Sequence, residues 1–173
     1  MVIREMSREE CLRMLAEWRL AKLACAHENQ PYVVPVYLAY YGLSGDEAWL
    51  YGSTTPGMKV EWMRTNPLVC VEVDEVAAYD QWASVIALGR YEELPENPGC
   101  DDERLRAWQV LKFQPVWWEP GSSAWAARAH RDPAEPFIPV YYRIRIERVT
   151  GHETTRDANK DAMACAAAPP PAG

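Results

Sequence analysis

Residues 51–59 combine features that can hold an anion, with the sequence YGSTTPGMK. The pattern predicts a strand that runs into a helix over 56–65, with Thr55 as its cap and Pro56 at its first position. Gly57 would let a ligand approach the backbone, and the unpaired N–H groups of a first helical turn point outward. Lys59 adds a positive charge where the helix dipole disfavours one, and a bound phosphate would resolve that conflict.

An ordinary capped helix explains the same pattern equally well, with Lys59 as a solvated surface lysine. Asn66-Pro67 would end this helix, because the residue before a proline disfavours the helical conformation. Capped helices are common and anion sites are few, so the local sequence leaves both interpretations open.

The cysteines and histidines form no metal or disulfide pattern. The five cysteines are odd in number and contain no C-x-x-C pair, and the three histidines lie far apart. We therefore predict neither a zinc site nor a disulfide framework, and expect the cysteines to be small buried residues or free thiols.

The composition indicates one globular domain that binds neither nucleic acid nor membranes. The chain has 173 residues, a net charge of −7 and cationic residues scattered among acids. A nucleic acid or an anionic membrane would need a concentrated basic patch. No apolar run approaches the length of a membrane span, and the N-terminus lacks the apolar core of a signal peptide, so we expect a cytoplasmic protein.

The chain divides into a domain over residues 1–155 and a disordered tail over 156–173. From Ala162 onward the sequence is AMACAAAPPPAG, a low-complexity composition that cannot bury enough apolar surface to order itself.

Most of the domain has strand periodicity. Ser7-Arg8-Glu9-Glu10 forms a capping box, which predicts a helix over 7–19, and a second charged helix is predicted over 101–113. Pro35 indicates an edge or a bulge, and Gly89 a bend. Antiparallel strands are predicted at 23–27, 32–41, 48–53, 68–73, 84–91 and 138–149. The fold class is therefore mainly β (α+β), with six or so antiparallel strands and short flanking helices in a small barrel.

The order of these signals resembles the pyridoxamine 5'-phosphate oxidase-like superfamily of FMN-binding split β-barrels, in its nitroimidazole-resistance-protein-like branch. The resemblance covers roughly residues 7–150. It rests on Gln30-Pro31-Tyr32, the run over 51–59, Asn66-Pro67, Trp82-Ala83-Ser84-Val85 and Gly89-Arg90-Tyr91-Glu92, in that order.

The resemblance implies a homodimer that holds FMN at its interface. Gly52 and Ser53 match positions that contact the flavin phosphate or ribityl chain, and Lys59 matches the lysine that pairs with the phosphate. A second cation would come from Arg64 or from an arginine of the last strand, across the dimer.

The flavin ring is implied to lie along the second strand. Val34, Pro35 and Val36 match the strand beside the isoalloxazine ring. Ser84 matches a polar residue near the flavin.

Four departures from the family pattern argue against its known substrates. Pyridoxamine phosphate oxidases have an arginine in place of Val34, a second cation in place of Met58 and a lysine in place of Ala39. Nitroimidazole-resistance proteins typically have a histidine in place of Gly52. The resemblance therefore implies an FMN-dependent oxidoreductase whose small-molecule substrate is unidentified.

Two alternatives share the same fold. One is a deazaflavin-dependent reductase, and the other is a non-catalytic flavin- or haem-binding protein with His27 or His130 as an axial ligand. Trp117, Trp118 and Trp125 would either line the flavin pocket or serve dimer packing.

Overall fold

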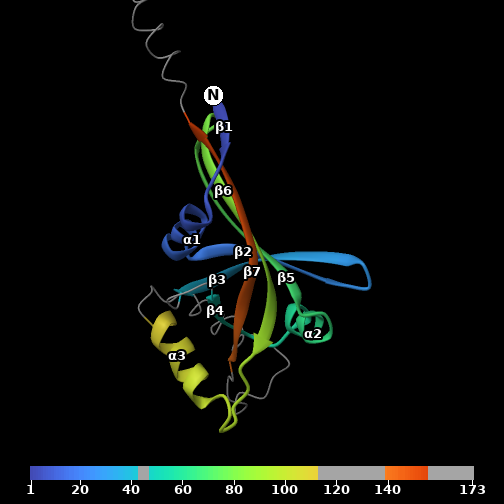
Figure 1. The fold of residues 1–173 in the computed structure, drawn as a ribbon. Coiled ribbons are helices and arrows are strands. Elements are labelled where there is room, and N and C mark those ends of the chain that lie inside the picture. The colour runs from blue at the N-terminus through green and yellow to red at the C-terminus, as the bar shows by residue number, and fades with distance from the viewer. Residues whose placement is uncertain (43–46, 113–138, 156–173) are drawn as a thin grey trace, which may run out of the picture.

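The computed structural model describes residues 1–42, 47–112 and 139–155, which form seven strands and three helices (Figure 1). In chain order these are β1 (Val2–Glu5), α1 (Arg8–Glu17), β2 (Leu20–His27), β3 (Gln30–Gly42), β4 (Ala48–Thr54), α2 (Met58–Thr65), β5 (Leu68–Ala78), β6 (Gln81–Glu93), α3 (Asp101–Leu111) and β7 (Val140–Thr155).

The strands form a closed antiparallel barrel. Their order is β1-β7-β4-β3-β2-β5-β6, and an additional pairing of β6 with β7 closes the ring. Six strands make up the barrel, and β1 attaches to the outer end of β7 through four paired residues. The predicted fold class, mainly β with antiparallel strands and short helices, is confirmed.

The core lies inside the barrel because alternate residues of each strand point inward. On β7, Tyr142, Ile144 and Ile146 are buried, whereas Arg145 and Glu147 between and beyond them are exposed. Residues that are almost fully buried come from every barrel strand, among them Leu23, Leu38, Leu50, Val71, Val85 and Ile144.

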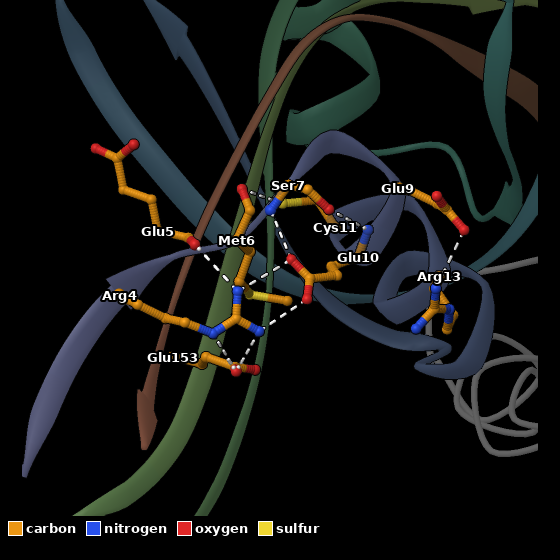
Figure 2. A network of polar contacts seen from close by, with 9 residues as sticks. All are labelled: Arg4, Glu5, Met6, Ser7, Glu9, Glu10, Cys11, Arg13 and Glu153. Carbon is orange, nitrogen blue, oxygen red and sulfur yellow. Dashed lines mark hydrogen bonds and ion pairs between the residues drawn. The ribbon is translucent and has the colours of Figure 1, made fainter. Parts of the chain in front are cut away.

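The polar network in Figure 2 fastens α1 to the sheet. The Ser7 hydroxyl accepts a hydrogen bond from the Glu10 amide at 3.3 Å, and the Ser7 amide donates to the Glu10 carboxylate at 2.7 Å. This confirms the predicted capping box. Arg4 of β1 donates to Glu10 at 2.7 Å and to Glu153 of β7 at 2.8 Å. These contacts lower the pKa of Glu10 to about 2, with Arg4 as the main cause.

Gly151 of β7 allows α1 to approach the barrel. A Cβ atom at this position would lie 2.7 Å from the Cys11 Sγ and 2.9 Å from the Met6 Sδ. The Met6 amide also donates to the Gly151 carbonyl oxygen at 2.8 Å. Any larger residue at 151 would therefore push the helix outward.

Strands β1 and β7 differ from the sequence prediction. Strand β1 was not predicted, because its four residues are all exposed and show no alternation. Strand β7 continues to Thr155, six residues beyond the predicted end at 149, through its pairing with β1 and β6.

The special positions Pro35 and Gly89 behave as predicted. Pro35 lies where β3 pairs with β2 alone, since pairing with β4 begins at Leu38. The register between β6 and β7 shifts at Leu88 and Gly89. The turn between β2 and β3 contains Glu28 and Asn29, both with positive φ, as a two-residue hairpin turn of type I′ requires.

Helix α3 covers a second, smaller core on the outside of the barrel. Trp49, Tyr51, Leu94 and Ala107 are buried there. The Tyr51 hydroxyl donates to Glu103 at 2.7 Å, and Arg143 of β7 forms an ion pair with Glu103 at 3.0 Å.

Among the helices of the described residues, none combines the length and the apolar character that a membrane crossing requires.

Candidate functional site

The N-terminus of α2 is open to a ligand. The helix begins at Met58, and Gly57 is its N-cap residue, with an extended backbone (φ 162°, ψ −175°) and no capping side chain. The prediction of Thr55 as the cap and Pro56 as the first helical residue is therefore wrong by two residues. The Gly57 carbonyl accepts from Val60 and Glu61, which leaves the Met58 and Lys59 amides without a capping side chain.

Lys59 is a half-buried cation that has no acidic partner among the described residues. Burial lowers its pKa below the ordinary value of 10.5, and the nearby Cys25 opposes this shift only partly. Within residues 1–42, 47–112 and 139–155, no carboxylate forms an ion pair with Lys59. A partly desolvated positive charge with no counter-charge among these residues, beside amides that lack a capping side chain, favours a bound anion.

Contacts in the C-terminal half of α2 hold the helix in place. The Trp62 ring packs against His27 and Tyr32, with centroid distances of 5.8 and 5.6 Å. The Asn66 side chain donates to the Ala26 carbonyl at 3.0 Å. Asn66 is also the C-cap residue, as predicted. The first turn is thus positioned without contributing its own polar groups.

Arg64 is already occupied by a carboxylate. Its guanidinium donates twice to Glu93 of β6, each time at 2.7 Å, and the Tyr91 hydroxyl donates to the same carboxylate at 3.0 Å. The contact with Arg64 lowers the pKa of Glu93. This ion pair ties α2 to the barrel, so Arg64 is a poor source of the second cation that a phosphate dianion favours.

Gly52 and Ser53 face opposite sides of β4. Gly52 lies between Leu38 of β3 and Tyr142 of β7, and a Cβ atom there would come within 2.5 Å of the Tyr142 ring. The packing of the buried Tyr142 ring therefore requires glycine at position 52. Ser53 is half-buried on the outer side, where pairing with β3 has ended and only β7 remains.

The predicted ring-binding residues lie on the open edge of β3. Val34 and Val36 point into the barrel and pack against its core, whereas Pro35 is exposed on the outside. Among the described strands, β3 pairs there with β2 alone, so the three residues share an open backbone edge. Tyr32 of the same segment contacts Trp62 of α2, which brings this edge close to the helix.

Ser84 belongs to a different cluster from Lys59. Its hydroxyl donates to Glu72 of β5 at 3.2 Å, and Glu72 forms an ion pair with Lys22 of β2 at 3.1 Å. Asp74 also pairs with Lys22. The structure thus places Lys59 near the open edge of β3, through Cys25 and the Tyr32–Trp62 contact. Ser84 lies among acidic residues elsewhere on the barrel, and no contact among the described residues joins Ser53 to Lys59.

Several predicted residues lie in other settings. His27 packs on Trp62, with its Nε2 atom 3.9 Å from Glu28. His130, Trp117, Trp118, Trp125 and the tail over 156–173 lie outside the described residues. Cys25 was not singled out as a neighbour of Lys59, although its inward alternation with Leu23 could have placed it in the core. No group of three potential metal ligands occurs in the described part of the chain.

The closed antiparallel barrel, with α2 inserted between β4 and β5, defines a split-barrel protein of the pyridoxamine 5'-phosphate oxidase-like class. A sequence profile described as pyridoxamine 5'-phosphate oxidase matches residues 7–153. The chain therefore belongs to the pyridoxamine 5'-phosphate oxidase family. Its nitroimidazole-resistance-protein-like branch remains a prediction.

Known relatives include proteins from rhizobia. The chain is 48% identical to an uncharacterised protein of Rhizobium meliloti over 121 residues, which cover 70% of this chain and 77% of the relative. A crystal structure described as an FAD-binding protein from Mesorhizobium loti is 41% identical, covers 90% of this chain and 99% of its own, and superposes with a TM-score of 0.69. The FAD-binding protein of Mycobacterium smegmatis, 16% identical, shares the fold over 86% of this chain and 98% of its own, with a TM-score of 0.58.

Proposed function

We propose that this protein is an oxidoreductase that binds FMN, with the cofactor phosphate at the N-terminus of α2. The observation that carries the proposal is Lys59, a half-buried cation for which the described part of the chain provides no acidic partner. It lies beside the Met58 and Lys59 amides, which no side chain caps there. A phosphate would supply the missing negative charge and accept those amide hydrogens.

The surrounding residues fit a flavin. The Ser53 hydroxyl, on the outer side of β4, is available to the phosphate or the ribityl chain. The exposed face of Pro35 and the unpaired backbone beside Val34 and Val36 offer an edge for the isoalloxazine ring. A bound flavin supplies one- and two-electron redox chemistry, while the protein determines which molecules reach it.

FAD is a second candidate for the same site. The Mesorhizobium loti protein that is 41% identical to this chain is described as FAD-binding. FAD carries a diphosphate where FMN carries a terminal phosphate, and the open N-terminus of α2 suits either anion. FAD carries an additional adenosine group, which needs space beyond the helix N-terminus, whereas FMN does not.

We further propose that the protein works as a homodimer with the flavin at its interface. The open edge of β3 leaves one side of the site without a described neighbour, and large apolar side chains such as Val33 and Leu20 are more than half exposed beside it. A second chain would cover this side and exclude water from the ring.

The test is to identify the cofactor and to reduce it. The purified protein should be yellow, and acid should release a flavin that chromatography with mass detection identifies as FMN or FAD. Anaerobic addition of reduced nicotinamide nucleotides should bleach the colour. A colourless protein that takes up no added flavin would refute the proposal, whereas a red protein would indicate haem and an absorbance maximum at shorter wavelength would indicate a deazaflavin.

A further inference from the structure

The barrel wall opens between β3 and β4, beside Gly52. Leu38 and Gly52 form the last pair between these two strands. Beyond it, Ser53 and Thr54 of β4 pair only with β7, and residues 30–37 of β3 pair only with β2 among the described strands. Gly52 therefore lies at the last closed position of the wall, next to the opening.

A buried tyrosine hydroxyl lies at this position and has no partner among the described residues. Tyr142 of β7 is paired with Gly52 of β4 and is 0% exposed. Its hydroxyl finds no hydrogen-bond partner in the described part of the chain. Burial raises the pKa of this hydroxyl, so it keeps its proton at neutral pH and can donate it in a hydrogen bond. Because buried polar groups of native proteins are almost always paired, the Tyr142 hydroxyl calls for an acceptor.

The neighbouring Tyr91 provides an internal comparison. Its ring is also buried, and its centroid lies 5.4 Å from that of the Tyr142 ring. The Tyr91 hydroxyl donates to Glu93 at 3.0 Å, and Arg64 donates twice to the same carboxylate. Two adjacent buried tyrosines thus differ in one respect, since Tyr91 has an acceptor within the described residues and Tyr142 does not.

The glycine at position 52 brings the Tyr142 hydroxyl to the backbone of β4. A Cβ atom there would lie 2.6 Å from the Tyr142 hydroxyl oxygen and 2.9 Å from the Leu38 Cδ2 atom. Any side chain at this position would take the space of the hydroxyl. The absence of a side chain therefore lets a polar atom of β7 lie at the edge of the opening.

We propose that the Tyr142 hydroxyl donates a hydrogen bond to the ribityl chain of the bound flavin. The inference rests on the flavin site of the proposed function, with the phosphate at the start of α2 and the ring along the open edge of β3. The ribityl chain joins these two groups, so it passes the opening between β3 and β4, the strand that leads into α2. A change of rotamer at the end of the Leu38 side chain gives an oxygen of this chain access to Tyr142.

The cost of the unpaired hydroxyl favours this assignment over a purely structural role. A phenylalanine would fill the same space without a polar atom. Leaving a buried donor unpaired costs free energy, and a ligand that accepts its hydrogen bond offsets this cost on binding. A buried water molecule on Tyr142 would offset the cost as well, but it would do so equally with and without flavin.

The variant Tyr142→Phe tests this hydrogen bond, and lumiflavin, which has the isoalloxazine ring and no ribityl chain, isolates it. Titration by flavin fluorescence should give a dissociation constant about fivefold or more above that of the wild type, for riboflavin and FMN alike. Lumiflavin should bind the two proteins equally. In urea unfolding, the cofactor-free variant should be at least as stable as the wild type, because it no longer buries an unpaired donor.

Tyr91→Phe is the matched control, because it also removes one hydroxyl from a buried tyrosine, in this case one with an acceptor. It should lower the stability of the cofactor-free protein, since Glu93 loses a donor. It should leave the ratio of the riboflavin and lumiflavin affinities unchanged. The effect of Tyr142→Phe should also differ from the loss of the Lys59 charge, which should weaken FMN binding and leave riboflavin binding unchanged.

The outcomes separate this inference from the flavin proposal. A wild-type protein that takes up no flavin would overturn both. Equal riboflavin affinity in the wild type and Tyr142→Phe would overturn the hydrogen bond alone. An equal loss of lumiflavin affinity would also overturn it, because the packing of the ring would then explain the effect. A cofactor-free Tyr142→Phe that is less stable than the wild type would do the same, because the hydroxyl would then have a partner within the protein.

Discussion

Replacing Lys59 by methionine should weaken flavin binding and stabilise the protein without its cofactor. The change keeps the length of the side chain and removes its charge. If Lys59 meets the phosphate, Lys59→Met removes a charge-assisted hydrogen bond worth roughly 1.5–3 kcal/mol, an affinity loss of about 10- to 150-fold for FMN. Riboflavin, which lacks the phosphate, should bind the two proteins about equally.

The stability effect has a defined sign and pH dependence. Burial lowers the pKa of Lys59 in the folded protein below 10.5, so the charged lysine destabilises the cofactor-free protein at neutral pH. Between the lowered pKa and 10.5 the unfolded chain binds more protons than the folded one, so stability rises with pH there. The advantage of Lys59→Met in urea unfolding should therefore be largest near neutral pH and shrink as pH rises toward 10.5.

Two assays and one control decide the interpretation. Flavin titration by fluorescence gives the affinities, and urea unfolding of cofactor-free protein gives the stabilities. Lys112→Met is the control, because it removes an exposed lysine that lies on the Trp108 ring of α3. It should neither weaken FMN binding nor stabilise the cofactor-free protein. Equal FMN affinity in the wild type and Lys59→Met would refute the phosphate assignment. A less stable cofactor-free Lys59→Met would show that Lys59 is not an uncompensated buried charge.

Three further changes test the fold around the site. Gly151→Ala should destabilise the protein by about 1–3 kcal/mol in urea unfolding, because its Cβ meets Cys11 and Met6, whereas Gly57→Ala, with no atom within 4 Å, should cost far less. In Gly52→Ala the added Cβ would clash with Tyr142 and Leu38 and not with a phosphate, so the variant should lose stability and bind both FMN and riboflavin more weakly. A loss of FMN binding alone would contradict this structural role of Gly52. Glu10→Gln should be less stable than the wild type at pH 7. The difference in stability should disappear as pH falls from about 4.5 to about 2, because the Glu10 carboxylate of the wild type then takes up a proton. A difference that persists at pH 2 would exclude the ion pair with Arg4 as its source.

The strands with clear alternation could be predicted from the sequence. Residues 32–41 and 48–53 alternate or run as apolar segments between turn residues, and they lie within β3 and β4. The capping box at Ser7 also has a purely local cause, since its two hydrogen bonds join residues three apart. These features depend on neighbours in the chain.

The parts that were missed depend on contacts between distant residues. Strand β1 exists through pairing of Val2–Glu5 with the end of β7, which no local pattern in four exposed residues could indicate. Helix α2 begins at Met58 because its position is set by Trp62, Arg64 and Asn66 at the other end, and Thr55-Pro56 remain in the connection.

The candidate site was predictable in its residue types and not in its geometry. Lys59 stood out because a cation is unusual in a first helical turn, and the structure adds that it is half-buried beside Cys25, 34 positions earlier in the chain. The interpretation of Gly52 required knowledge of Tyr142, which reaches it across the β4–β7 pairing.

The position of β7 in the barrel constrains how the chain can fold during synthesis. This strand pairs with β4 and β6, so the ring cannot close before residues 140–155 are available. At a ribosomal rate of about 5–20 residues per second, roughly 4–17 s pass between the completion of β4 at Thr54 and the start of β7 at Val140. During that interval β4 has an unpaired edge that could pair with another nascent chain. Barrel closure is therefore a late, long-range event, and the unfinished chain is the form of this protein most exposed to aggregation.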